Sequence, residues 1–385
     1  MNRIILNETS YFGAGCRSVI AVEAARRGFK KAFFVTDKDL IKFGVAAEII
    51  KVFDDNHIPY ELYSDVKANP TIANVQNGVA AYKASGADFI VALGGGSSID
   101  TAKGIGIVVN NPDFADVKSL EGVADTKHKA VPTFALPTTA GTAAEVTINY
   151  VIIDEDARKK MVCVDPNDIP AVAIVDPELM KTVPPQYTAY QGFDALFHNT
   201  EVMISNGVNI ISETIALSAI ERIAKYLPLA VKNGEDLEAR EHVAYGSTIA
   251  GIAMQLTSTT AQHAMEHAMS AYHPNLPHGA GLIMISKAFS EFFIEKHACD
   301  GQFIKMARAM GIPEADKPED FITALVKLQK DCGVDDLRMS DYGFAPDESM
   351  RLAVNARETM GGLFLANPCE MTDEECADIF EKSYR

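Results

Sequence analysis

The segment FIVALGGGSSIDTAKG, residues 89–104, decides the fold of the first half of the chain. Phe89–Leu93 is an apolar run typical of a buried strand, and the glycines at 94–96 separate it from a stretch of helical character. Glycine lets the backbone turn sharply, and the amino terminus of the next helix can then bind an anion. The spacing is not the G-x-G-x-x-G fingerprint of Rossmann domains. Because Ser97 and Asp100 also fit a capping box, a capped helix after a tight turn explains the segment equally well.

Short β-branched runs alternate with helical stretches on both sides of this segment, from residue 30 to about residue 180. The runs that we expect to be strands are Lys31–Thr36, Tyr60–Tyr63, Phe89–Leu93, Thr133–Leu136 and Ala171–Val175, with helices at Gly44–Asn56 and Ile72–Ser85. This alternation predicts parallel β/α units with a nucleotide site at the carboxyl ends of the strands.

A second loop has the composition of a nucleotide-binding turn. LPTTAGTAAEVT, residues 136–147, follows another predicted strand and combines hydroxyl side chains with a glycine. Small donors suit close approach to ribose or phosphate, although an ordinary threonine-rich loop has the same composition. Two such loops at successive strand ends favour a nucleotide cleft. Asp37, at the end of the first predicted strand, is either an acceptor for an adenosine ribose or an exposed turn residue.

After Val183–Pro185 the pattern becomes helical. Apolar residues recur at three- and four-residue spacing in Asn209–Tyr226, Val243–Leu256 and Ala280–Phe293. We therefore predict an α/β dinucleotide-binding domain at residues 1–182 and an all-helical domain at 183–385. A chain of 385 residues exceeds the usual size of a single core. Because the sequence contains no flexible linker, the two halves are expected to pack around one cleft.

The helical half holds a candidate metal site. Asp194 and His198 are four residues apart, as are His263 and His267, so each pair shares a helix face. His278 follows Pro277 and is expected to open the next helix. One carboxylate and several imidazoles suit a divalent ion of the Fe(II) or Zn(II) type.

The sequence alone does not decide whether these residues form a metal site. A single histidine on a helix is more often structural than a ligand, and spacing does not show that residues 65 positions apart converge. His267 and His273 compete for any assigned role. Cys369 and Cys376 are alternative ligands, although two ordinary thiols is the simpler interpretation.

Composition limits the classes of function. The net charge of −17 argues against nucleic acid or an anionic membrane surface as the main partner. Six scattered cysteines with no C-x-x-C pair indicate reduced thiols and a cytoplasmic location. The apolar run Ile4–Leu6 is too short for a signal peptide, and no stretch approaches the ~20 apolar residues of a membrane helix.

The chain resembles the iron-containing (group III) alcohol dehydrogenases over nearly its whole length. The resemblance rests on ILNETSYFG, VTDKDL, NPTI, GGGSSIDTAKGIGI, LPTTAGTAAEVTINYVI and KKMVCVDP, followed in the expected order by the histidine motif. It implies an α/β dinucleotide-binding domain and an all-helical domain in a dehydroquinate synthase-like architecture, with metal and substrate between them. It further implies NAD, Fe(II) or else Zn(II), and a small alcohol or aldehyde such as 1,2-propanediol or lactaldehyde. A homodimer joined through a first strand at Arg3–Leu6 is also expected.

The resemblance assigns roles to individual residues. The implied metal ligands are Asp194, His198, His263 and His278, and His267 is the implied catalytic histidine beside nicotinamide and substrate. The residues that match cofactor contacts are Asp37, Asn69, Gly95, Gly96, Ser97, Asp100, Thr138, Thr139, Thr142 and Lys160.

Some positions depart from the family pattern and bear on the substrate. Phe197 and Asn199 replace small residues near the first ligand pair, and ETMGGLFLANPCEMT near the carboxyl end is divergent. One rival function is a lyase like dehydroquinate synthase, whose anionic substrate calls for Arg and Lys near the metal. The segments around the candidate ligands contain neither, which favours a small neutral substrate. A non-catalytic NAD- or metal-binding protein is the second rival.

Overall fold

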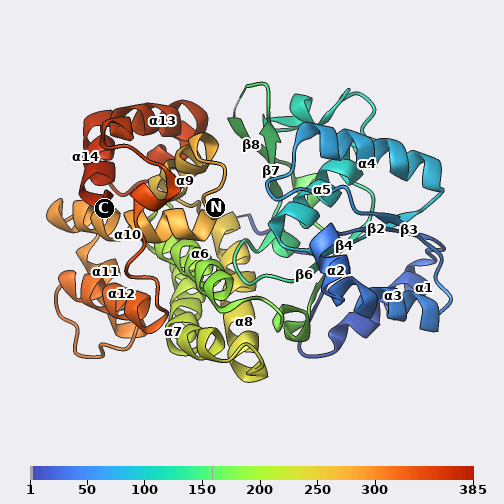
Figure 1. Cartoon of the computed structure of the whole chain (residues 1–385), viewed down its shortest axis with the longest axis horizontal. Coiled ribbons are helices and arrows are strands. Elements are labelled where there is room, and N and C mark those ends of the chain that lie inside the picture. The colour runs from blue at the N-terminus through green and yellow to red at the C-terminus, as the bar shows by residue number, and fades with distance from the viewer. Residues whose placement is uncertain (1–2, 158) are drawn as a thin grey trace. The chain divides into compact units, whose positions relative to one another are not determined.

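The computed structural model describes residues 3–157 and 159–385, which divide into two compact units. One unit runs from Ile5 to Lys181, and the other runs from Thr182 to Arg385 and takes in the N-terminal residues up to Ile4. The first unit is an α/β domain with a parallel sheet, and the second is helical (Figure 1). The predicted fold class is confirmed.

The α/β unit is built on a six-stranded sheet in which every neighbouring pair is parallel. In spatial order the strands are β1 (Thr9–Phe12), β9 (Val172–Val175), β6 (Thr133–Pro137), β4 (Phe89–Gly94), β2 (Ala32–Val35) and β3 (Tyr60–Tyr63). The five predicted strands are all present. Each inner strand is buried on both faces, which explains their continuous apolar runs.

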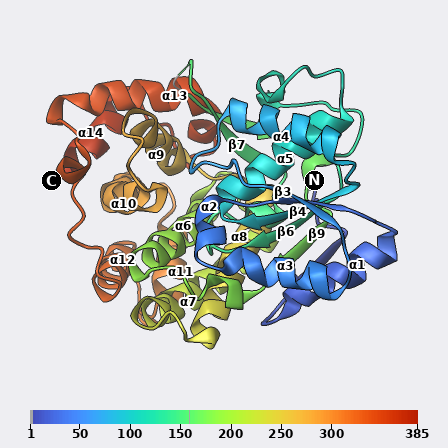
Figure 2. The ribbon, with the colours of Figure 1, turned by 45° about the vertical axis from the view of Figure 1, so that its right-hand side comes forward.

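Helices cover both faces of this sheet. Figure 2 shows α4 (Ile72–Ser85) and α5 (Gly96–Asn110) on one side and α1 (Val19–Arg27) and α3 (Val45–Asp55) on the other. Side chains of β2 alternate between the two cores: Phe33 packs in a cluster with Val75 of α4, and Phe34 packs in a cluster with Ile49 of α3. The short α2 (Lys38–Lys42) follows β2.

A second, smaller sheet was not predicted. It contains β5 (Gly122–Val123), β8 (Lys159–Val164) and β7 (Asn149–Asp154), and β7 and β8 form an antiparallel pair. The backbone N–H of Ile153 donates to the carbonyl oxygen of Pro70 at 2.7 Å. This contact places the β7–β8 pair beside the segment that contains Asn69.

The Arg3–Leu6 segment, expected to be a strand that joins two copies, forms no strand within this chain. Residues 3–7 form no strand with the rest of the chain, and β1 instead spans Thr9–Phe12. Thr9 and Phe12 pair with Val172 and Val175 of β9, whereas Ile4 and Leu6 are 44% and 55% exposed.

The helical unit contains nine α-helices in its described residues. They are α6 (Pro185–Ile204), α7 (Ile210–Lys232), α8 (Leu237–Leu256), α9 (Ala261–Tyr272), α10 (His278–Glu295), α11 (Asp300–Ala309), α12 (Glu319–Asp331), α13 (Ser349–Leu365) and α14 (Asp373–Ser383). Two glycines let α7 pack closely on its neighbours. A Cβ on Gly192 of α6 would lie 2.7 Å from Cδ2 of Leu227, and one on Gly246 of α8 would lie 2.7 Å from Cδ1 of Ile223.

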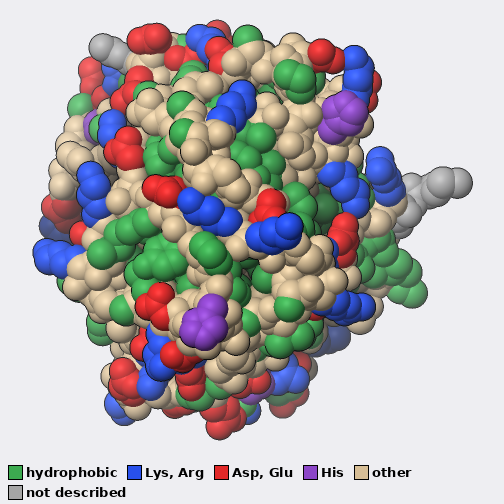
Figure 3. Space-filling view, turned by 90° about the vertical axis from the view of Figure 1, so that its right-hand side faces the viewer, with side chains coloured by type: hydrophobic (Ala, Val, Ile, Leu, Met, Phe, Trp, Pro, Cys, Tyr) green, Lys and Arg blue, Asp and Glu red, His purple; other side chains and the backbone are tan. Residues whose placement is uncertain are grey.

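One face of the described chain mixes charged and apolar side chains (Figure 3). On the face drawn in Figure 3, acidic and basic side chains are interspersed, with apolar side chains between them. Within residues 3–157 and 159–385, no helix has the length and apolar character that crossing a bilayer requires.

Candidate active site

Helix α6 carries the first candidate ligand pair. Asp194 is 4% exposed and His198 is 7% exposed, so both polar side chains lie inside the helical unit. Their four-residue spacing puts Asp194 Oδ1 3.6 Å from His198 Nδ1. A buried carboxylate needs partners, because an uncompensated charge in the interior is costly.

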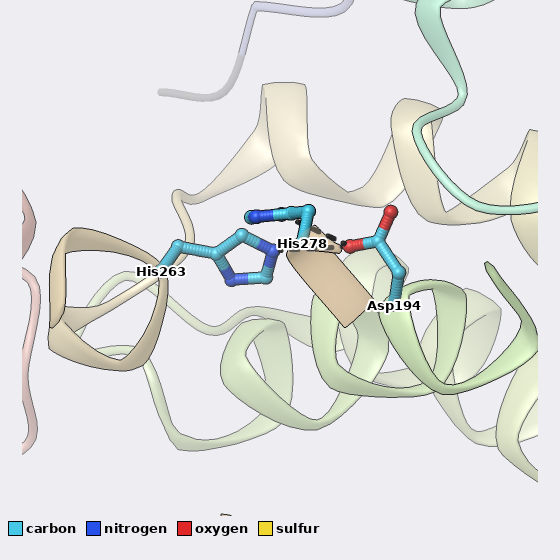
Figure 4. Close-up of side chains that lie close together, drawn as sticks. All are labelled: Asp194, His263 and His278. Atoms are coloured by element: carbon cyan, nitrogen blue, oxygen red, sulfur yellow. Dashed lines mark hydrogen bonds and ion pairs between the residues drawn. The ribbon is translucent and has the colours of Figure 1, made fainter. Parts of the chain in front are cut away.

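Helices α9 and α10 bring two further histidines to Asp194. Oδ1 of Asp194 lies 3.3 Å from Nε2 of His263 and 3.6 Å from Nε2 of His278. The three side chains come from three different helices and point toward one another, as Figure 4 shows. One donor atom from each lies within 4.8 Å of the others, a spacing suited to a shared metal ion. His278 is the first residue of α10, as predicted.

A glycine explains how α10 reaches Asp194. A Cβ built on Gly279 would lie 2.6 Å from the carbonyl carbon and 2.9 Å from Cα of Tyr190. No side chain fits there, so the backbone of α10 packs directly on α6. Tyr190 is four residues before Asp194, which puts His278 beside the carboxylate one turn farther along.

His198 lies at the edge of this group. Its ring stacks on that of His263, with centroids 4.3 Å apart and planes 14° from parallel. Burial lowers the pKa of His198 to about 4, so the ring is neutral at pH 7 and its nitrogens can bind a cation. The structure thus brings all four implied ligands together, and Asp194, His263 and His278 form one compact set in the described residues.

Two glutamates in the centre were missed by the sequence analysis. Glu201 accepts from Nδ1 of His263, and Glu266 accepts from Nδ1 of His278. Both glutamates are 0% exposed. Burial alone would lower the pKa of His263, but Glu201 and Asp194 outweigh it and raise that pKa to about 10. Each glutamate follows a candidate ligand histidine by three residues, at His198–Glu201 and His263–Glu266, but each bonds a different histidine in the fold.

The other two histidines of the motif differ in position. His267 is one helical turn after His263, and its ring centroid is 5.3 Å from that of His278. His273 instead faces the 344–348 segment, where its Nε2 lies 3.0 Å from Oε2 of Glu348 and its ring lies 3.8 Å from that of Phe344. His267 is therefore placed beside the cluster, whereas His273 holds the turn between α9 and α10 to a later segment.

The unusual residues Phe197 and Asn199 belong to the interior of the helical unit. Phe197 is 1% exposed and its ring lies 5.8 Å from that of Phe193. Nδ2 of Asn199 donates to the carbonyl oxygens of Ala195 and Gly246 at 2.8 and 3.3 Å. Both side chains therefore serve packing of α6.

In the α/β unit, the two candidate loops lie side by side. They follow the adjacent strands β4 and β6, where Gly94 is paired with Pro137. A Cβ on Gly95 would lie 3.1 Å from Cγ2 of Thr139, and one on Gly96 would lie 2.9 Å from Cγ2 of Thr142. The glycines thus allow the turn to contact the threonine loop, and Thr138 N–H donates to Gly94 O at 3.0 Å.

The predicted capping box at Ser97 and Asp100 is wrong. Helix α5 begins at Gly96, so its N-cap residue is Gly95 rather than Ser97. Glycine has no side chain that could cap the helix. Oγ of Ser97 instead accepts from the backbone N–H of Asn69 at 3.2 Å, and Asp100 accepts from Val151 N–H at 3.0 Å. The first N–H groups of α5 therefore remain suited to an anion.

Other residues surround this turn. Asp37 Oδ1 caps α2 by accepting from Leu40 N–H at 2.8 Å, and the side chain of Leu40 approaches Gly94. Lys160 pairs with Ile153 in the β7–β8 hairpin. Lys103, which the sequence analysis did not single out, is 1% exposed and donates to Thr147 O at 2.8 Å, so it ties α5 to the end of the threonine loop.

Comparison with known proteins matches both units to one family. The model of the iron-containing alcohol dehydrogenases matches residues 7–177, and that of the Fe-containing alcohol dehydrogenase family, C-terminal, matches residues 188–384. The chain belongs to the iron-containing alcohol dehydrogenases, oxidoreductases that act on CH–OH groups.

Individual relatives cover the chain from end to end. It is 40% identical to lactaldehyde reductase of Escherichia coli K12, over 100% of both chains. A crystal structure of 1,3-propanediol oxidoreductase matches with a TM-score of 0.94 and 31% identity, also over 100% of both chains. Sulfoacetaldehyde reductase from Bifidobacterium kashiwanohense, solved in complex with NAD+, matches with a TM-score of 0.88 and 28% identity, over 99% of this chain and 98% of that one.

Proposed function

We propose that this protein transfers hydride between NAD(H) and a small alcohol or aldehyde, with a divalent metal ion at the Asp194 cluster. The observation that carries the proposal is the approach of two imidazole Nε2 atoms to one buried carboxylate oxygen, at 3.3 and 3.6 Å. Relatives named for reactions of lactaldehyde and 1,3-propanediol support the reaction class.

The residues that would hold the ion are Asp194, His198, His263 and His278. One carboxylate and three imidazoles form a set suited to Fe(II), our first choice, and also to Zn(II). An ion bound there would supply Lewis acidity toward the oxygen of the substrate. The chain itself contributes burial, since Asp194, His198 and His263 are each less than 8% exposed.

The residues proposed to bind NAD are in the α/β unit. The uncapped amino terminus of α5 and the turn at Gly95 and Gly96 suit the pyrophosphate. Ser97, Asn69 and the threonine loop offer hydroxyl and amide groups around that turn, and Asp37 is proposed to accept from the adenosine ribose. NAD carries the hydride, and these residues hold and align the cofactor.

His267 is the proposed proton carrier. It lies beside His278 but outside the compact ligand set of Asp194, His263 and His278. An imidazole changes protonation near neutral pH, which suits transfer of the alcohol proton to solvent.

The finer features of the proposal concern substrate, assembly and location. A short neutral substrate such as lactaldehyde or 1,2-propanediol is favoured, because no Arg or Lys occurs in residues 192–205 or 262–281.

We propose a cytoplasmic homodimer in which the segment of residues 3–6, with exposed Ile4 and Leu6, contacts a second copy. Light scattering of the purified protein, with and without residues 1–6, tests the dimer.

An absorbance assay at the NADH band tests the reaction. The protein reloaded with Fe(II) should reduce NAD with 1,2-propanediol or butanol, and should oxidise NADH with lactaldehyde. A lyase like dehydroquinate synthase would give no net change in NADH, and a non-catalytic binding protein would give no turnover with any of these compounds. Either of those two results would overturn the proposal.

A further inference from the structure

Glu266 is a buried carboxylate that none of the proposed roles uses. It is 0% exposed, on the face of α9 that meets α10. Its Oε2 accepts from Nδ1 of His278, and its Oε1 accepts from Oγ of Ser270 at 2.8 Å. Both carboxylate oxygens of this buried side chain therefore have hydrogen-bond partners.

The fold makes room for this side chain. A Cβ on Gly281 would lie 2.8 Å from Cγ and 3.2 Å from Oε1 of Glu266. A side chain at position 281 would therefore require Glu266 to shift. Gly281 on α10 and Ser270 on α9 thus hold Glu266 from two sides.

The hydrogen bond fixes which nitrogen of His278 is available. When Nδ1–H donates to Glu266, the proton stays on Nδ1 and the lone pair is on Nε2. Nε2 is the atom that faces Asp194, at 3.6 Å. The side chains of Glu266, His267 and His278 also lie within 4.8 Å of one another, but an ion on that side would compete for the nitrogen that Glu266 already holds.

His263 has the same arrangement. Oε2 of Glu201 accepts from its Nδ1, and Nε2 faces Asp194 at 3.3 Å. The other oxygen of Glu201 accepts from the N–H and hydroxyl of Thr260, at 2.8 and 2.7 Å, and so also caps α9. Two separate glutamates thus act on two histidines with the same geometry.

We infer that Glu266 is a positioning residue that orients His278 to bind the metal ion through Nε2, as Glu201 orients His263. This inference rests on the proposed metal site. A carboxylate on the far nitrogen fixes the ring and its tautomer and makes the coordinating nitrogen more basic. Glu266 itself does not touch the ion or the substrate.

The test compares Glu266→Gln with Glu348→Gln. Glutamine keeps the size of the side chain and an oxygen acceptor but removes the charge. Glu348 pairs with His273 in the same unit, outside the ligand set, which makes it a matched carboxylate–histidine control. Metal affinity is measured by competition with a chelator for Fe(II) and Zn(II), and unfolding temperature is measured on the metal-free proteins.

We expect Glu266→Gln to weaken metal binding by about 10–100-fold, with an unfolding temperature of the metal-free protein close to that of wild type. Glu348→Gln should change the affinity by less than about twofold. Side-chain nitrogen NMR of the Zn(II)-loaded wild type should show His278 with metal at Nε2 and a proton at Nδ1. Glu266→Ala should weaken the affinity further and lose this tautomer signature.

Three results would overturn the inference. One is wild-type affinity in Glu266→Gln, and the second is an equal loss in Glu348→Gln. The third is metal at Nδ1 of His278 in the wild type. If the wild type itself binds neither Fe(II) nor Zn(II), the proposed function fails together with the inference, and that outcome is distinct from the other three.

Discussion

Gly279 and Tyr190 are in direct backbone contact, and that contact places His278 beside Asp194. A side chain at position 279 would have its Cβ 2.6 Å from the carbonyl carbon of Tyr190. Gly279→Ala should therefore move the start of α10 away from α6, destabilising the protein by about 1–3 kcal/mol and weakening metal binding. Elemental analysis and thermal unfolding measure the two effects.

Gly301→Ala is the control for this substitution. Gly301 lies in α11, and a Cβ there would have no heavy atom within 4 Å. Alanine at an open helix position should leave metal binding unchanged and stabilise the protein by about 0.5–1 kcal/mol. If Gly279→Ala binds metal as wild type does, the backbone contact does not position His278.

The four histidines of the motif should divide into three groups. His263→Ala and His278→Ala should lose metal and turnover together, because each removes a ligand of the compact group. His267→Ala should keep its metal and lose ~10²–10⁴-fold in turnover. His273→Ala should keep both, with a stability loss of about 1 kcal/mol from the contact with Glu348.

Metal content and turnover of each purified variant check this division. A metal-free His267→Ala together with a loaded His278→Ala would mean that these two histidines exchange roles. Full metal and full turnover in all four variants would contradict the metal-dependent mechanism.

Asp37 should make the protein prefer NAD over NADP. Like charges about 4 Å apart at an effective dielectric near 20 repel by roughly 4 kcal/mol before screening, so a 2′-phosphate is disfavoured. Because Asp37 also caps α2, Asp37→Asn is the better variant, since it removes the charge and keeps a capping oxygen. Its kcat/KM ratio for the two cofactors should shift toward NADP. Equal efficiency of the wild type with both cofactors would show that Asp37 does not face the ribose.

The cysteines should react slowly in the folded protein. Burial raises the pKa of most of them to about 12, namely Cys16, Cys163, Cys299, Cys332 and Cys376. At pH 8 the thiolate fraction of such a group is on the order of one in ten thousand. A chromogenic disulfide reagent should react quickly with all six thiols only after unfolding. Rapid reaction of more than one thiol in the native protein would contradict this burial.

Strands buried on both faces were predictable, and strands defined by distant pairing were not. The apolar run Phe89–Leu93 matches β4 closely. The segment Thr9–Phe12 alternates between partly buried and exposed positions, and the strand that pairs with it, Val172–Val175, is far along the chain. That partner cannot be identified from local sequence patterns, so the strand at Thr9–Phe12 was not predicted.

In the candidate site, contacts within one helix were predictable and contacts between helices were not. Helical spacing within α6 and α9 predicted that Asp194 would lie near His198 and that His263 would lie near His267. The approach of α10 to α6 depends on the absence of one side chain at Gly279, which no periodicity reveals. Glu266 was missed because an acidic residue three positions after a histidine is common on solvent-exposed helix faces. Only its complete burial distinguishes it.

The most direct test of the central claim is turnover during removal and return of the metal. The protein is treated with a chelator, reloaded with Fe(II) under anaerobic conditions, and assayed with NAD and 1,2-propanediol at each step. The account predicts that turnover disappears with the metal and returns in proportion to Fe(II), up to about one ion per chain. The buried carboxylate of Asp194 is the shared partner of His263 and His278. In the Asp194→Asn variant, Fe(II) should therefore restore little or no turnover. Full turnover in the chelated, metal-free protein would contradict the account.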